Sequence, residues 1–103
     1  MSDADPGEAF HRYVLELFDA LARDRLLTER LADAASPAAA SVLETLADAM
    51  ESARAAGELR EDATQQDLRV LLCGVALQLG RFGERDPATW RRYGEMVLAA
   101  FRR

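Results

Sequence analysis

Apolar residues recur along most of the chain at the three- and four-residue spacing of an amphipathic helix. From about residue 8, this spacing predicts a first helix with charged residues opposite its apolar face. That face consists of Phe10, Tyr13, Val14, Leu17, Phe18 and Leu21. The pattern loosens at residues 23–25, which predicts a kink or a second short helix ending before Ser36. Residues 1–7 carry no such pattern, and we expect them to form a flexible lead-in.

Capping residues mark the boundaries of the later helices. Ser36-Pro37 and Asp86-Pro87 each place a capping side chain before a proline, which is favoured in a first helical turn. Thr64, three residues before Asp67, predicts a capping box. Gly57 predicts a helix end, because glycine adopts a left-handed backbone at low cost. These signals predict helices over residues 37–56, 65–82 and from 87 onward.

Two of these helices have one clear inward face each. The helix over residues 37–56 should bury Val42, Leu43, Leu46, Met50 and Ala53. The last helix should bury Trp90, Tyr93, Val97, Ala100 and Phe101. The chain is therefore predicted to be all-α, a bundle of four to five helices.

The penultimate helix is apolar on two sides. At 100° per residue, one arc should belong to the core of the domain and holds Leu68, Leu71, Leu72, Val75, Leu79 and Phe82. A single chain of 103 residues has too few helices to cover a second, nearly opposite arc, so we expect a second copy to cover it. The expected homodimer interface, through the last two helices, comprises Val70, Cys73, Gly74, Leu77, Arg81, Met96 and Leu98.

Composition narrows the class of protein. A chain of 103 residues suits one domain, and half of its residues are hydrophobic. The net charge of −5 argues against binding nucleic acid directly, because phosphate contacts need a basic surface. The acidic start is no signal peptide, and no run is long enough for a membrane span, so we expect no membrane partner and a cytoplasmic protein.

No pattern for catalysis is present. The sequence contains no phosphate loop, dinucleotide fingerprint, nucleophile elbow or metal motif. His11 borders an apolar face, and we interpret it as partly buried and structural. Cys73, the only cysteine, is interpreted as a small buried hydrophobe. We therefore expect no enzyme, no cofactor and no metal.

Four segments, in this order and spacing, resemble the C-terminal effector-binding domain of TetR-type transcriptional repressors. They are Phe10-x-x-Tyr13-Val14, the connector from Gly57 to Leu68, the apolar helix after it, and Asp86-Pro87-x-x-Trp90-x-x-Tyr93. The resemblance covers residues 10–101 and implies a helical domain that dimerises through its last two helices and senses a small apolar effector. Carried over, the family's effector pocket suggests Tyr13, Leu17, Phe18, Leu46, Met50, Leu72 and Val75.

Such repressors begin with a helix-turn-helix domain, and residues 1–103 contain none. We therefore expect one effector-sensing and dimerisation domain that reaches DNA only through a helix-turn-helix outside this chain. The alternative is a stand-alone helical dimerisation or interaction protein without a small-molecule ligand. A solid core would favour that alternative, and a cavity would favour an effector.

Overall fold

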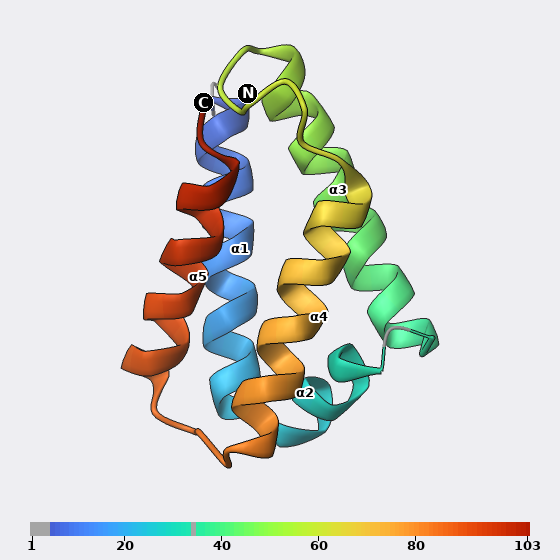
Figure 1. Cartoon of the computed structure of the whole chain (residues 1–103), viewed down its shortest axis with the longest axis vertical. Helices are drawn as coiled ribbons and strands as arrows, with labels where there is room; N and C mark the ends of the chain where they lie inside the picture. The colour runs from blue at the N-terminus through green and yellow to red at the C-terminus, as the bar shows by residue number, and fades with distance from the viewer. Residues whose placement is uncertain (1–4, 34) are drawn as a thin grey trace.

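The computed structural model describes residues 5–33 and 35–103, and these residues form an all-helical bundle (Figure 1). In chain order the helices are α1 (Pro6–Arg23), α2 (Arg25–Ala32), α3 (Pro37–Ala55), α4 (Gln65–Arg81) and α5 (Pro87–Phe101). The all-α prediction is confirmed. A separate short helix, rather than a kink, follows α1, because Asp24 leaves helical geometry and caps α2 through the backbone N–H of Leu27 (3.1 Å).

The predicted caps are confirmed. Ser36 and Asp86 cap the helices that open with proline. At the start of α4, the Thr64 hydroxyl accepts from the N–H of Asp67 (3.1 Å), whose carboxylate accepts from the N–H of Thr64 (3.0 Å). Gly57 follows α3 with a φ of 80°.

The prediction of a flexible lead-in is wrong for residues 6 and 7. The carboxylate of Asp5 accepts a hydrogen bond from the N–H of Glu8 and caps α1, so the helix begins at Pro6. Residues 1–4 of the predicted lead-in lie outside the described residues.

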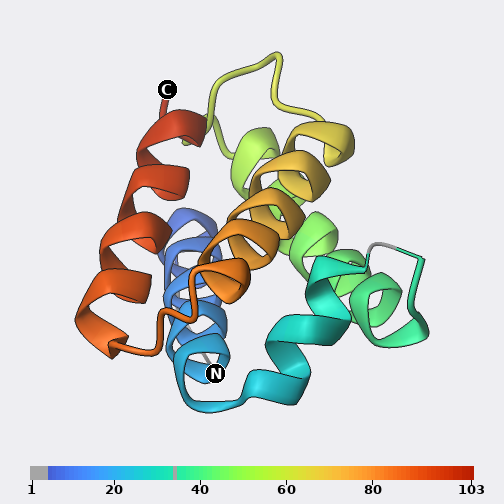
Figure 2. The same ribbon diagram turned by 60° about the horizontal axis from the view of Figure 1, so that its bottom comes forward.

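The five helices pack as two groups that meet at the core (Figures 1 and 2). Helix α1 packs against α5 and α3, and α2 packs along α4. The aromatic part of the core joins α1 to α5, with the ring centroids of Phe10 and Phe101 6.0 Å apart and those of Phe18 and Trp90 6.4 Å apart. Gly94 allows this approach, since a Cβ atom there would lie 3.1 Å from Cγ of Phe18.

The connector between α3 and α4 is fixed to the end of α5. Leu59 forms an antiparallel bridge with Arg102, and the N–H of Arg60 donates to the carbonyl oxygen of Phe101 (3.0 Å). Leu59 and Ala63 are buried, so the connector closes one end of the core.

Some residues expected inside are exposed. Phe82 is 76% exposed because α4 ends at Arg81 and Phe82 is its C-cap, beyond the reach of the core. Tyr13 is 41% exposed and Ala100 is also exposed, since each lies at the edge of its helix's buried face. The prediction of a partly buried His11 is wrong as well, because that side chain lies on the exposed side of α1.

Candidate functional site

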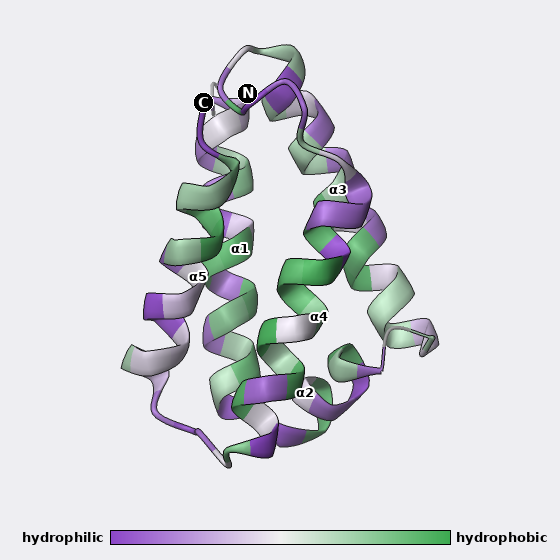
Figure 3. Ribbon diagram, in the orientation of Figure 1, coloured by the Kyte–Doolittle hydropathy of each residue, from purple (hydrophilic) through white to green (hydrophobic). Residues whose placement is uncertain are grey.

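An apolar groove runs along α4 and is bordered on one side by Tyr93 of α5. It has a volume of about 380 Å³. Its lining is apolar apart from one amide and one phenol: Val70, Leu71, Gly74, Val75, Gln78, Leu79, Phe82 and Tyr93. Figure 3 shows hydrophobic residues along the visible side of α4. The two helices that border the groove pack more extensively on other helices than on each other.

The side chains that border this groove leave a large apolar area exposed. Val70 is 61% exposed, Leu77 41% and, across on α5, Met96 47%. Single exposed apolar residues are ordinary, but several of them on the two helices that border an apolar groove are typical of an interaction site. We call Val70, Gly74, Leu77 and Arg81, which follow one another around one side of α4, the outer strip.

The structure divides the seven residues predicted for the dimer interface. Five are exposed, namely Val70, Gly74, Leu77, Arg81 and Met96. Cys73 and Leu98 are buried within the single chain, at 9% and 6% exposure, and offer almost no surface to a second copy. Cys73 lies on the side of α4 that also carries Gly80, which approaches Thr28 of α2, while Leu98 extends the buried face of α5.

The burial of Cys73 agrees with its predicted role as a small hydrophobe. Burial also raises the pKa of its thiol above the ordinary value, because the thiolate would lose its hydration. The thiol is therefore protonated and unreactive near neutral pH.

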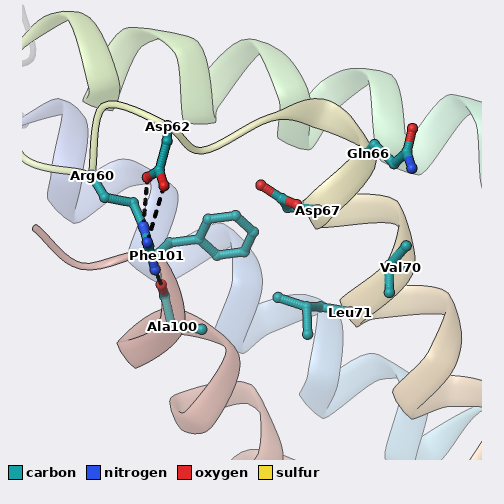
Figure 4. Close-up of a pocket in the computed structure, with 8 residues that line it drawn as sticks. All are labelled: Arg60, Asp62, Gln66, Asp67, Val70, Leu71, Ala100 and Phe101. Carbon is teal, nitrogen blue, oxygen red and sulfur yellow. Dashed lines mark hydrogen bonds and ion pairs between the residues drawn. The ribbon is translucent and has the colours of Figure 1, made fainter.

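At the end nearest the connector, the apolar groove opens into a polar mouth (Figure 4). Arg60 donates to both carboxylate oxygens of Asp62, at 2.6 and 3.1 Å, and reaches the carbonyl oxygen of Ala100 at 3.5 Å. The hydrogen bonds from Arg60 lower the pKa of Asp62, so the pair stays charged near neutral pH. Val70 and Leu71 line both the mouth and the groove, so the two are adjacent.

The residues predicted for an effector pocket do not surround one cavity. Phe18, Met50 and Leu72 are at most 2% exposed and belong to the packed core. Three others, Tyr13, Leu17 and Leu46, line a separate groove of about 330 Å³ between α1 and α3. Val75 lines the apolar groove along α4.

A further cavity, of about 250 Å³, lies between α2 and the second half of α4. Arg25, Arg81 and Arg85 contribute to its lining, and we call it the arginine cavity. No sequence pattern predicts this cavity, since these arginines come from α2, α4 and the loop before α5. Charge clusters that form only in three dimensions leave no spacing pattern along the chain.

The described residues include no group of three or more His, Cys, Asp or Glu side chains placed to hold a metal ion. None of the helices just described is long and apolar enough to cross a bilayer.

Comparison with known proteins identifies a family for the whole bundle. A family model described as the C-terminal domain of SbtR-like transcriptional regulators, of the TetR type, matches residues 5–102. No curated protein and no solved structure matches the chain. The matched range includes all five helices, the connector and both sides of the apolar groove. The chain therefore belongs to the family of TetR-type C-terminal domains found in SbtR-like transcriptional regulators.

Proposed function

We propose that this chain is the effector-sensing and dimerisation domain of a TetR-like regulator, and that two copies pair through α4 and α5. The observation that carries the proposal is the apolar groove with Val70, Leu77 and Met96 exposed beside it. A second copy related by two-fold symmetry presents the same groove and strip, so each apolar surface covers the other. The four helices of such an interface would be α4 and α5 from each chain.

The charge of the chain agrees with a domain that senses an effector and does not itself contact DNA. With a net charge of −5, the domain is poorly suited to bind the phosphate backbone of DNA directly. DNA is reached through a helix-turn-helix outside residues 1–103. An effector that prefers one arrangement of the helices shifts the population of that arrangement, and the shift moves the attached DNA-reading domains.

Substitution of Leu77 by Arg tests the pairing. The new guanidinium would enter an apolar interface without a partner, and a buried unpaired charge is strongly unfavourable. We expect the unchanged chain to be a dimer and Leu77→Arg a monomer by size-exclusion chromatography with light scattering. Leu77 lines the arginine cavity and not the apolar groove, so Val70→Arg, at a residue that does line the groove, serves as a second variant and should behave in the same way.

Ala55→Arg is the matched control, because Ala55 is exposed at the end of α3, where an added cation is compatible with the helix dipole. This variant should remain dimeric, and circular dichroism should show that all variants keep their helices. A monomeric parent chain, or dimers that persist in both Leu77→Arg and Val70→Arg, would exclude pairing through the outer strip.

The alternative is a helical dimerisation protein that binds no small molecule. The tight burial of Phe18, Met50 and Leu72 favours it, since these predicted effector contacts lie in a packed core. A thermal-shift screen with small apolar and amphipathic compounds separates the two functions. A ligand at 100 times its Kd should stabilise the domain by about 2.7 kcal/mol, whereas a ligand-free protein gives no shift with any compound.

A further inference from the structure

The arginine cavity carries more positive charge than its surroundings compensate. The residues that line the cavity include three arginines but only one acidic residue, Glu29. Within the described residues, none of these three arginines lies within 4 Å of a carboxylate oxygen, whereas five others are ion-paired: Arg12, Arg23, Arg54, Arg60 and Arg91. This local surplus stands out in a chain whose net charge is −5.

Arg85 is held in place before any ligand arrives. Its Nη2 donates to the carbonyl oxygen of Leu21 and to Oγ1 of Thr28 (3.2 Å), and its guanidinium carbon lies 5.5 Å from the centroid of the Trp90 ring. Thr28 is itself fixed, because its hydroxyl donates to the same Leu21 oxygen (2.7 Å) and is 2% exposed. A preorganised side chain loses little conformational entropy when it binds a ligand.

The guanidinium of Arg85 also retains unused donors. In the described part of the chain, its Nε is buried without an acceptor, and the hydrogen bonds of the side chain all come from Nη2. Nη1 makes no hydrogen bond within the described residues, so it can donate to an anion in the cavity. Arginine presents several donors in a planar fork, which suits the oxygens of carboxylates and phosphates.

The remaining walls of the cavity are apolar or small. Ala32 from α2 and Ala76, Leu77 and Gly80 from α4 line it. Its volume of about 250 Å³ is slightly below the range typical of sites for drug-sized ligands, about 300–1,000 Å³. A ligand that fits is therefore small and has an apolar portion next to its charge.

We infer that the arginine cavity binds a small amphipathic anion, a carboxylate or phosphate group on a short apolar body. The anionic group lies among Arg25, Arg81 and Arg85, and the apolar body lies against α2 and α4. The regulatory meaning of this site rests on the proposed function, since Leu77 and Arg81 belong to both the cavity and the outer strip. An effector here would change the side of α4 that borders the second copy.

Isothermal titration calorimetry on the full chain, at a constant ionic strength of about 0.15 M, tests the site. The probes are hexanoate and hexyl phosphate, with acetate lacking the apolar body and hexanol lacking the charge. We expect one saturable site per chain for at least one of the two amphipathic anions, with affinity at least tenfold above acetate and hexanol. The ratio between the two anions identifies the preferred head group.

The double variant Arg25→Gln/Arg81→Gln removes two exposed guanidinium groups without touching the bonds of Arg85. This double variant should raise the Kd of the anion at least tenfold. The matched control, Arg30→Gln/Arg92→Gln, makes the same charge change at exposed arginines outside the cavity and should stay within twofold of the parent. Equal loss in both variants, or no saturable binding of either anion, would overturn the inference.

Light scattering on the same samples keeps the two proposals separate. A dimer that binds neither anion refutes the cavity site and leaves pairing through α4 and α5 intact. A monomer that binds an anion in an Arg25- and Arg81-dependent way refutes the pairing and leaves the cavity site intact.

Discussion

Trp90→Ala should destabilise the domain by about 3–5 kcal/mol, which is the range for truncating a large buried aromatic side chain. Trp90 is fully buried between α5 and α1, with its ring against Phe18. Its indole Nε1–H donates to the carbonyl oxygen of Glu84 (2.8 Å), and its ring supports the guanidinium of Arg85. The substitution thus leaves a cavity and frees the loop before α5.

Domains of this size have a total unfolding free energy of about 5–15 kcal/mol, so the loss is a large fraction of the whole. Urea denaturation followed by circular dichroism measures it, because the only tryptophan is removed and fluorescence is lost. Trp90→Phe is the matched control, since it keeps most of the aromatic volume and loses the hydrogen bond, at a cost of about 1–3 kcal/mol. A loss below about 1 kcal/mol for Trp90→Ala would show that the α1–α5 contact does not organise the core.

Gly94→Leu should destabilise the domain by about 2–3 kcal/mol, because the contact between α1 and α5 has no room for a side chain. A Cβ atom at position 94 would already lie 3.1 Å from Cγ of Phe18 and 3.3 Å from Cδ2 of Leu15. The longer side chain must push the helices apart, which outweighs the gain of about 1 kcal/mol from replacing a helical glycine.

Gly74→Leu is the matched control, because a Cβ atom at position 74 would meet nothing within 4 Å. It should leave the fold unchanged or stabilise it by up to about 1 kcal/mol. Both variants are best measured in the Leu77→Arg background, where pairing of chains does not contribute to the unfolding curve. Equal stabilities for Gly94→Leu and Gly74→Leu would contradict the close approach of α5 to α1.

Helix boundaries were accessible from the sequence because the signals are local. Thr64 with Asp67, and Gly57 with its left-handed backbone, act within a few residues of themselves. Periodicity likewise identified Phe10, Phe18 and Trp90 as core residues. The sequence does not separate the short helix after α1 from a kink, because eight residues give too little periodicity.

The sequence predicts less well which element packs on each face of a helix, because this depends on neighbours that are distant in sequence. The helical pattern places Cys73 on an outer arc, yet the structure buries it on the side of α4 that also carries Gly80, next to Thr28 of α2. The same pattern places Phe82 in the core, whereas the helix ends at Arg81 and Phe82 is its exposed C-cap. The sequence does not predict the arginine cavity, since residues 25, 81 and 85 come together only after α2 packs along α4.

The apolar groove also bears on how rigid the bundle is. On one side of it α5 rests on α1, and on the other α4 rests on α2, while the direct packing of α4 on α5 is limited. A partner that contacts α4 and α5 together would hold the two helices in a fixed arrangement. We therefore expect α4 and α5 to move relative to each other in a single subunit, and we expect pairing to restrict that motion.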